Sequence, residues 1–460
     1  MSSSQPTHDL VILGGGSGGY AAALRAAELG LTVALVEKGK LGGTCLHQGC
    51  VPTKALLHAA EVADSTRESA SFGVNATFEG IDMGRVNAYK DGVIGRLHKG
   101  LQGLVKARKV EYVEGEGRLT APNTVTVDGR ELVGKDVVLA TGSRPRSIPG
   151  LEIGGRVMTS EQALQLDFVP QSVVVLGGGV IGVEFASVFT SFGAQVTVVE
   201  GLDRIVPAED EAVSKTLLRA FRKRKIDVRT GVMFESVDNR EDGVTVRLQD
   251  GTTLEADLLL VAIGRGPVTE GMGFEEAGVT LDRGFVVTDA DLRTGVDHLW
   301  AVGDIVPGLQ LAHRGFAQGI FVAEKIAGLE PAPIDEAGIP RVTYCDPEIA
   351  SVGLTEAKAK EQYGEDAVEA LEYNLGGNGK SQILATQGFV KLVRRKDGPV
   401  VGIHMVGARM GEQVGEAQLI YNWEALPEEV AALVHAHPTQ NEALGEAHLA
   451  LAGKPLHAHA

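Results

Sequence analysis

The sequence of 460 residues contains only three cysteines, Cys45, Cys50 and Cys345. An odd, low number argues against a secreted disulfide framework, and a close pair in a reducing compartment is typical of a catalytic or metal-binding site. The chain has no apolar run of the roughly 18 residues that a membrane-spanning helix needs, and no signal peptide is visible at its N-terminus. We therefore expect a cytoplasmic protein without a membrane span.

Basic residues are also few, since 43 Lys and Arg stand against 60 Asp and Glu, a net charge of −17. A surface this acidic disfavours non-specific binding to nucleic acid or to an anionic membrane. Glycine, by contrast, is abundant at 60 residues, and it occurs in clusters. The length favours about three domains.

The glycine clusters belong to an internal repeat. Residues 8–43 align without a gap with residues 171–206, at an offset of 163. Each copy reads as an apolar strand, a G-x-G-x-x-G turn, a helix and a second strand that ends in an acid. The motif residues are Gly14, Gly16, Gly19 and Glu37 in the first copy and Gly177, Gly179, Gly182 and Glu200 in the second.

This motif predicts nucleotide binding. One glycine makes a tight turn, one lets the backbone approach a pyrophosphate, and one allows the helix to pack on the strand. Phosphates bind at the helix N-terminus, and the acid accepts hydrogen bonds from ribose. A single copy also occurs in plain glycine-rich loops, but two full copies predict two nucleotides. No arginine stands where a 2′-phosphate would need one after Glu200, although Arg204 is nearby, which favours NAD over NADP.

The remaining pattern is coarser. Apolar strands with glycine loops at 136–146 and 257–267 are expected to close the two nucleotide domains. We expect strands at 298–302, 389–393 and 401–406, and helices at 55–62, 316–327, 411–425 and 428–434. Prolines mark a boundary before residue 341, and residues 341–460 carry no glycine motif, so they form a separate α+β domain.

Cys45 and Cys50 follow the first glycine unit directly. Five residues of ideal helix advance about 7.5 Å, more than the about 6.8 Å that disulfide Cα atoms allow. A bridge would need a distorted turn, which Gly49 and Pro52 would permit. A thiol at a helix N-terminus also gains thiolate character. Stray thiols or half of a metal site are the alternatives, but further metal ligands are lacking, and the setting favours a redox pair.

His437 and Glu442 lie near the other end, in the segment His-Pro-Thr-Gln-Asn-Glu. A histidine oriented by a carboxylate is the general base that thiol chemistry needs. Taken alone, the segment is more typical of a surface loop. His435 and His437 also have a spacing found in metal sites, but no nearby residue completes one.

Together these residues resemble the flavin-dependent pyridine nucleotide disulfide oxidoreductases, and among them most the dihydrolipoamide dehydrogenases. The resemblance covers the whole chain through GGGSGG at 14–19, GGTCLHQGCVPTK at 42–54, ATGSRPR at 140–146, GGGVIGVE at 177–184, AVGD at 301–304 and HAHPTQNE at 435–442. It implies an α/β fold with two Rossmann-like domains and a C-terminal α+β dimerisation domain. The implied bounds are 1–148 and 280–340 for the FAD domain, 149–279 for the NAD domain and 341–460 for the dimerisation domain.

The resemblance also implies FAD and NAD as cofactors and no metal. For FAD the matching residues are Gly14, Gly16, Gly19, Glu37, Lys54, Gly117, Thr141, Gly142, Ser143, Asp304 and Ala312. For NAD they are Gly177, Gly179, Gly182, Glu184, Glu200, Val237 and Gly264. Lys54 and Glu184 match a pair near the reactive edge of the flavin, where the lysine stabilises reduced flavin and the glutamate compensates its buried charge.

The implied reaction is the oxidation of dihydrolipoyl groups with reduction of NAD. His437, oriented by Glu442, takes a proton from a substrate thiol, which attacks Cys45, and electrons pass from Cys50 through FAD to NAD. In this family the histidine comes from the partner subunit, so a homodimer is expected. The implied partner is the lipoylated acyltransferase of a 2-oxo acid dehydrogenase complex or the lipoylated glycine cleavage carrier. The His437–Pro438 bond is expected to be cis.

Two alternatives remain open at this point: an NADH-dependent reductase of another small disulfide, and a complex subunit whose docking role dominates. Mercuric reductase and the large thioredoxin reductases carry C-terminal thiols that this chain lacks, and glutathione reductase usually prefers NADPH. The chain departs from the common pattern at His47 and Gln48, and at Arg314, Phe316 and Gln318. We expect Cys345 to be a buried, inert thiol.

Overall fold

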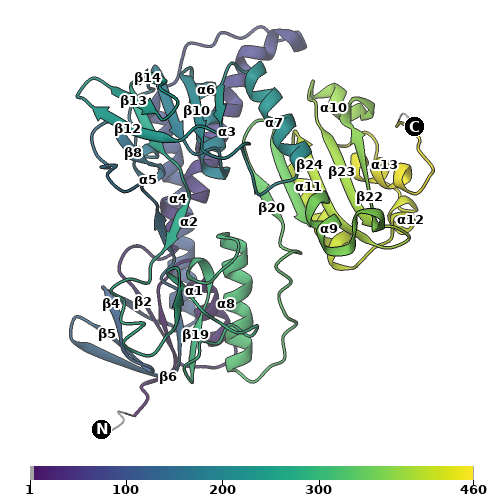
Figure 1. Ribbon diagram of the computed structural model, residues 1–460. Coiled ribbons are helices and arrows are strands. Elements are labelled where there is room, and N and C mark those ends of the chain that lie inside the picture. The colour runs from purple at the N-terminus through teal and green to yellow at the C-terminus, as the bar shows by residue number, and fades with distance from the viewer. Residues whose placement is uncertain (1–4, 459–460) are drawn as a thin grey trace.

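The computed structural model describes residues 5–458, which form three domains (Figure 1). Two lie one above the other and are built from the two glycine units, and the third, coloured green to yellow, stands beside the upper one. None of the helices formed by residues 5–458 is long and apolar enough to cross a membrane.

The first domain is a sheet with helices on one face. Parallel strands run in the order β3-β2-β1-β6, β19 joins β6 in parallel, and β4 and β5 extend β6 as an antiparallel hairpin. The strands are β1 (His8–Leu13), β2 (Val33–Glu37), β3 (Glu111–Glu114), β4 (Gly117–Ala121), β5 (Thr124–Val127), β6 (Arg130–Leu139) and β19 (Leu299–Ala301). The helices are α1 (Ser17–Glu28), α2 (Gly43–His47), α3 (Cys50–Glu68), α4 (Met83–Ala107) and α8 (Ala312–Ile326), and the 3₁₀ turns are η1 (Ser69–Phe72) and η2 (Gly303–Ile305).

The second domain repeats this plan. Five parallel strands run in the order β11-β10-β9-β15-β8, and an antiparallel sheet, β12-β13-β14, takes the place of the hairpin. The elements are β8 (Val157–Thr159), α5 (Ser160–Ala163), β9 (Ser172–Leu176), α6 (Val180–Phe192), β10 (Gln195–Glu200), α7 (Glu211–Lys223), β11 (Asp227–Thr230), β12 (Phe234–Asn239), β13 (Val244–Leu248), β14 (Thr253–Ala256) and β15 (Leu258–Val261).

The uninterrupted apolar strands of the repeat are explained by burial on both faces. In β1, Leu10 and Ile12 enter one core cluster while Val11 enters the cluster on the other face. In β9, Val173 and Val174 divide between two clusters in the same way. A strand covered on both sides has no solvent face and therefore shows no polar alternation. The predicted two Rossmann-like domains are confirmed.

The boundary expected at residue 279 lies earlier in the structure. The chain crosses between the nucleotide domains along an antiparallel pair, β7 (Ser143–Pro145) and β16 (Arg265–Pro267). Beyond β16, Met272, Phe274 and Val279 pack in the core of the first domain, followed by the hairpin β17 (Leu281–Asp282) and β18 (Phe285–Val286). Residues 268–279 thus belong with the first domain, because their apolar side chains complete its core.

The C-terminal domain is an antiparallel sheet in the order β20-β21-β24-β23-β22, with its own core cluster. Its strands are β20 (Arg341–Thr343), β21 (Glu348–Gly353), β22 (Val368–Asn374), β23 (Phe389–Arg395) and β24 (Val400–Gly407). Its helices are α9 (Glu356–Tyr363), α10 (Gly379–Ile383), α11 (Met410–Asn422), α12 (Pro427–Ala431) and α13 (Glu442–Leu451), with 3₁₀ turns η3 (Glu365–Ala367) and η4 (Leu375–Gly377). The predicted separate α+β domain is confirmed.

Candidate active site

The first glycine of the motif, Gly14 in one unit and Gly177 in the other, has the same surroundings in both units. A Cβ atom on Gly14 would lie 2.2 Å from the carbonyl oxygen of Ala140, and one on Gly177 would lie 2.4 Å from that of Ala262. Both glycines have a φ of +110°, a conformation that side chains disfavour. The tight turn predicted for each unit is therefore present, and no larger residue fits there.

The third glycine of each unit lies against the first. A Cβ on Gly19 would come within 1.8 Å of the Gly14 carbonyl oxygen, and one on Gly182 within 1.9 Å of the Gly177 carbonyl oxygen. The helix can pack this closely on the strand only because both positions lack a side chain. The packing role predicted for these residues is confirmed in both units.

The middle glycines behave differently and test whether a dinucleotide fits. Gly16 and Gly179 are the N-cap residues of α1 and α6, and a Cβ on either would have nothing within 4 Å. An open cradle at a helix start, where backbone N–H groups lack partners, suits a pyrophosphate. The residues present therefore fit the two dinucleotides expected from the sequence.

The acids at the ends of β2 and β10 hold their loops identically. Glu37 accepts hydrogen bonds from the amides of Gly15 and Gly39, both at 2.7 Å. Glu200 accepts them from Gly178 at 2.7 Å and Leu202 at 2.8 Å. Each carboxylate oxygen retains a second lone pair, so the acids are positioned to bind a ribose as well.

A pocket at the first unit collects several of the residues predicted to bind FAD. It is lined by Gly14, Glu37, Gly117 and Thr141, together with Val268 and Met272. The last two lie in residues 268–279, which pack with the first domain, and no sequence motif indicates them. The Thr141 hydroxyl donates to the Val268 carbonyl at 2.5 Å, which ties this segment to the pocket.

Other predicted FAD residues gather near η2. The Ser143 hydroxyl donates to Asp304 at 2.5 Å and accepts from Arg265 Nε at 2.8 Å. Gly142 precedes Ser143 with a φ of +74°, and Ala312 begins α8. The contact between Arg265 and Ser143 was not predicted from the sequence, because the two residues are 122 positions apart and no motif connects them.

The cysteine segment is a helix broken at its centre. Cys45 lies in α2 and Cys50 begins α3, with Gln48 and Gly49 between them outside helical geometry. The distorted turn predicted from the spacing is present. Both cysteines are free thiols, Cys45 half-buried and Cys50 exposed.

Two glycines bring this segment onto the first nucleotide loop. The Gly42 amide donates to the Gly15 carbonyl at 2.9 Å, and a Cβ on Gly43 would lie 2.7 Å from the Cα atom of Gly16. The redox segment therefore rests directly on the pyrophosphate cradle.

The two thiols differ in acidity. The interaction with Cys50, together with burial, raises the pKa of the Cys45 thiol. The same interaction lowers the pKa of the Cys50 thiol to about 7, with desolvation opposing and the positive charge of Lys54 assisting. Of the two thiols, Cys50 is therefore the more acidic.

Lys54 and Glu184 form the predicted ion pair. Nζ of Lys54 in α3 lies 2.8 Å from both carboxylate oxygens of Glu184 in α6, and Glu184 is buried at 2% exposure. Burial by itself would lower the pKa of Lys54, but Glu184 raises it above its usual value. The ammonium beside Cys50 therefore stays charged.

His437 and Glu442 also form the predicted pair. Nδ1 of His437 lies 2.8 Å from Glu442 Oε1, and the Thr439 amide donates to Oε2 at 2.7 Å. Burial works to raise the pKa of Glu442, but the Thr439 amide and the His437 ring hold it below its usual value. The carboxylate stays ionised and orients the ring, and the His437–Pro438 bond is cis as expected.

One chain does not bring this histidine to its own cysteines. The segment of His437 leads into α13, which lies at the outer side of the C-terminal domain, whereas α2 lies among the nucleotide domains (Figure 1). The side chain of His437 is 71% exposed. The imidazole therefore faces outward, available to another molecule.

The second unit contains one unexpected neighbour. Of the residues predicted to bind NAD, Gly264 follows β15 and has a φ of +105°. Val237 lies in β12 and packs with a core cluster of the second domain. Met233, which is 55% exposed, lies instead beside Gly201, where a Cβ would be 2.7 Å from its sulfur. Arg204 donates to the Pro207 carbonyl at 2.9 Å, so it is already engaged next to Glu200.

The departures from the common pattern have structural partners. His47 Nε2 bonds the Leu41 carbonyl at 2.9 Å, and its ring meets that of His98 edge-on. Gln318 accepts from the Gly303 amide at 2.7 Å, and buried Arg314 pairs with Glu336 at 2.8 Å. The Gln318 contact, with a bond of 3.5 Å from Arg314 Nη1 to the Gly303 carbonyl, ties the η2 turn, and with it Asp304, to α8.

Two family models cover the chain. Residues 8–319 match "Pyridine nucleotide-disulphide oxidoreductase", and residues 339–448 match the dimerisation domain of the same family. Among curated proteins, a dihydrolipoyl dehydrogenase of Bacillus subtilis is 42% identical, with 98% of this chain and 99% of the relative covered. One from Geobacillus stearothermophilus is 38% identical over 98% and 97%, and the mitochondrial dihydrolipoyl dehydrogenase 2 of Arabidopsis thaliana is 38% identical over 99% and 92%.

Solved structures give the same result. LpdA from Mycobacterium tuberculosis superposes with a TM-score of 0.89 at 28% identity, covering 96% of this chain and 99% of the other. The Cu(II) complex of RclA, an HOCl-induced flavoprotein disulfide reductase from Escherichia coli, has a TM-score of 0.87 at 25% identity, over 96% and 99%. This chain belongs to the pyridine nucleotide-disulphide oxidoreductase family.

Proposed function

We propose that this protein is a dihydrolipoyl dehydrogenase, which oxidises the dithiol of a dihydrolipoyl group and reduces NAD. The observation that carries the proposal is the thiol pair that Gly42 and Gly43 hold against the first glycine unit, four residues from the lysine of the Lys54–Glu184 ion pair. The names of the relatives agree with it. The carboxylate of Glu200 at the end of β10, which would repel a 2′-phosphate, favours NAD over NADP.

The exchange begins with the Cys45–Cys50 pair as a disulfide. A substrate thiol gives its proton to Nε2 of His437, and its sulfur attacks Sγ of Cys45. The Cys45–Cys50 bond breaks, and Cys50 leaves as a thiolate beside Lys54. The second substrate thiol then attacks the first sulfur, and its proton passes to the departing sulfur of Cys45. The cyclic disulfide is released, Cys45 is left as a thiol and Cys50 as a thiolate, and the first proton remains on His437, so that the two electrons of the substrate reside on the cysteines.

The family works with FAD and NAD, and the two glycine cradles are the places for them. The residues that would hold FAD are Gly14, Gly16, Glu37, Gly117, Thr141 and Asp304. When bound, FAD supplies the redox group through which the electron pair of the thiols reaches NAD. Lys54 keeps a positive charge at this position, and Glu184 balances it.

The dimerisation domain indicates a homodimer, and we propose that each active site uses His437 of the second copy. The exposure of the His437 side chain, and the separation of α13 from α2 in Figure 1, support this arrangement. A mixed dimer of Cys45→Ser and His437→Gln chains tests it. One of its two sites would combine an intact cysteine pair with an intact histidine, so turnover should return, although each variant alone is inactive. No recovery on mixing, with subunit exchange verified by mass, would overturn the arrangement.

Lipoylated proteins are the substrates we propose in the cell, namely the acyltransferase of a 2-oxo acid dehydrogenase complex or the carrier of glycine cleavage. We place the protein in the cytoplasm, where NAD is available to reoxidise the dithiol. Salt titration of binding to a basic docking domain tests the partner, since an acidic surface predicts steep salt dependence.

The central test uses purified holoenzyme. Dihydrolipoamide-driven reduction of NAD and of NADP is followed side by side by absorbance of the reduced nucleotide. Rapid reduction of NAD with little reduction of NADP is expected. A flavin-containing protein that ignores dihydrolipoamide but uses NADH to reduce another small disulfide would overturn the assigned substrate.

A further inference from the structure

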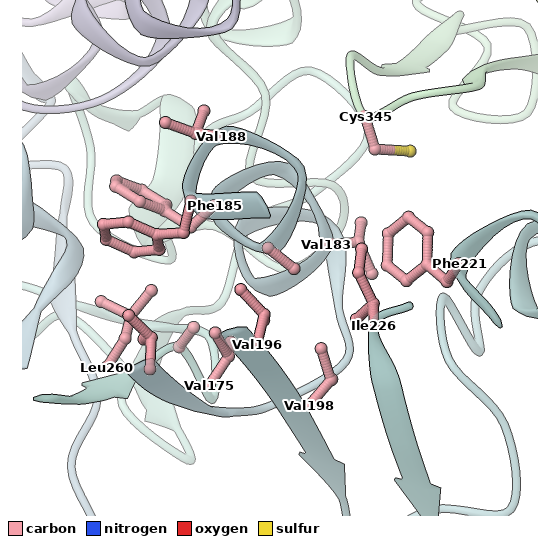
Figure 2. Packing of buried hydrophobic residues seen from close by; sticks show 14 of the residues in the cluster. Val175, Val183, Phe185, Val188, Val196, Val198, Phe221, Ile226, Leu260 and Cys345 are labelled. Atoms are coloured by element: carbon pink, nitrogen blue, oxygen red, sulfur yellow. The ribbon is translucent and has the colours of Figure 1, made fainter. Parts of the chain in front are cut away.

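Residues 343–347 of the C-terminal domain form a junction segment at which all three domains meet. The Asp346 amide donates to the hydroxyl of Ser187 in α6 at 3.2 Å. Cys345 is buried beside Val183 and Phe221 (Figure 2), in a cluster that also contains Leu56 of α3. The junction segment is therefore held firmly against α6, the helix that carries Glu184.

Tyr344, within the junction segment, contacts both members of the Lys54–Glu184 pair. Its amide donates to Glu184 Oε1 at 2.9 Å, the same oxygen that Lys54 binds at 2.8 Å. Its ring lies 4.9 Å from the Lys54 ammonium, and an aromatic face within about 6 Å attracts a cation. One residue thus fixes the glutamate through its backbone and covers the lysine with its side chain.

The charges around Cys50 are few and come from three elements. Cys45 of α2, Lys54 of α3 and Glu184 of α6 face the thiol. Lys54 favours the thiolate and Glu184 opposes it, so their net effect depends on which of the two lies closer to the sulfur. Any contact that fixes the ammonium and the carboxylate therefore also controls the charge state of Cys50.

The groups that face Tyr344 are Lys54, Glu348, Glu184 and Glu412. Lys54 is the cation among them, which makes its ammonium the group that the ring attracts. Tyr344 therefore limits where the charge can lie.

We propose that Tyr344 is a positioning residue of the redox site: it holds the Lys54–Glu184 pair so that the ammonium is directed at Cys50. Through this contact the C-terminal domain, which also carries the dimerisation surface, sets the thiolate character of Cys50. The inference rests on the proposed function only for the role of Cys50 as the thiolate.

The test is a pH titration of the long-wavelength absorbance that a thiolate produces beside bound flavin. A Cys45→Ser background leaves Cys50 as the single redox thiol and needs no reductant. Tyr344→Leu keeps the backbone amide and an apolar side chain but removes the ring. We expect the apparent pKa of Cys50 to rise by about half a pH unit, the scale of one partly exposed cation–π contact.

Two control variants show whether a shift of the midpoint comes from the aromatic ring of Tyr344 or from a general loss of stability. Tyr344→Phe keeps the ring and should titrate like the parent. Tyr363→Leu removes the ring beside Arg395, 5.6 Å away in the same domain, and should also leave the midpoint in place. If Tyr344→Leu does not fold, Tyr344→Met removes the ring with a flexible apolar side chain and takes its place.

Ser187→Ala gives an independent perturbation, because it removes the acceptor of the Asp346 amide and loosens the junction segment. A smaller rise in the same direction is expected. A midpoint unchanged in Tyr344→Leu and in Ser187→Ala, with flavin retained, would overturn the inference. Dihydrolipoamide turnover of the wild type is measured in parallel: its absence with a shifted midpoint would overturn only the proposed function.

Discussion

The two glycine units have the same contacts up to their acids and then diverge. Glu37 and Glu200 each accept two backbone amides at 2.7 to 2.8 Å. Beyond them, the first unit continues through Gly42 and Gly43 into the redox helix, while the second continues through Ile205 and Val206, which are 1% and 2% exposed.

The same space beside the nucleotide loop is therefore used in two ways. Gly43 lets the backbone of the redox segment touch Gly16. In the second unit Val206, which aligns with Gly43, donates its amide to the Gly178 carbonyl at 2.8 Å, the bond that Gly42 makes to Gly15 in the first unit, and buries its side chain. A nucleotide fold thus becomes a redox site through the residues that follow the acid, and the fingerprint alone does not distinguish the two.

The largest effect is expected when alanine replaces the glycine at which the helix packs on the strand, in one unit at a time. An alanine at Gly19 or Gly182 would place its Cβ 1.8 or 1.9 Å from a backbone oxygen, so the helix must move off its strand. We expect Gly19→Ala to lose bound flavin and Gly182→Ala to retain it while NAD binding weakens more than tenfold, a cost of at least about 1.4 kcal/mol. Flavin absorbance after gel filtration and the KM for NAD measure the two outcomes. Loss of flavin from both variants would show that the units are not independent.

Exchanging the residues that differ tests the divergence directly. Gly43→Val introduces the residue found at the matching position 206, with a backbone overlap at Gly16 and a φ of +60°. We expect a local cost of about 2–5 kcal/mol, which displaces α2 and reduces dithiol turnover by at least about a hundredfold. The reciprocal Val206→Gly empties a buried position but also relieves a φ of +41°, so it should cost no more than about 1 kcal/mol of stability and leave turnover intact. Equal turnover in both variants would contradict the role given to Gly43.

The sequence predicted the glycine units well because their constraints are local. A turn at Gly14 and packing at Gly19 involve atoms a few residues apart, and the strand pattern records burial on both faces. Residues 268–279 were assigned to the wrong domain, because the core that Phe274 completes lies elsewhere in the chain. The helix α4 was missed, since its five glycines lower helix propensity and packing of Leu101 and Val105 stabilises it instead.

The same difference between local constraints and distant contacts applies to the residues of the site. Cys45, Cys50, His437 and Glu442 were predicted from spacing and resemblance; the structure contains the His437–Glu442 hydrogen bond, and the two cysteines in it are free thiols. Tyr344, Met233 and Arg265 were not found, because each acts through a contact between domains or between distant segments. Such contacts depend on how the domains pack, and no motif in a single segment records that packing.

The acids offer a smaller and more selective perturbation. Glu37→Gln and Glu200→Gln each replace a carboxylate that accepts two amides with a neutral group that accepts through one oxygen. We expect a loss of about 1–3 kcal/mol at the affected loop, seen as faster flavin dissociation for Glu37→Gln and as a KM for NAD raised about tenfold for Glu200→Gln. Glu200→Arg should weaken NAD binding further, because the loop amides would then face a cation. Unchanged NAD kinetics in both Glu200 variants would contradict a role of this acid in nucleotide binding.

The smallest effect is expected at the open glycines, and it separates ligand contact from folding. Gly16 and Gly179 have ordinary negative φ values, and a Cβ on either meets no protein atom. Gly16→Ala and Gly179→Ala should therefore keep the unfolding temperature of the flavin-free protein within about 1 °C, since no contact in the protein is lost. If the backbone there approaches a pyrophosphate, the added methyl displaces it, and affinity should fall a few-fold, for flavin in Gly16→Ala and for NAD in Gly179→Ala. If NAD affinity fell in Gly16→Ala and flavin affinity in Gly179→Ala, the two nucleotide assignments would have to be exchanged. If neither affinity fell, the phosphates would lie elsewhere.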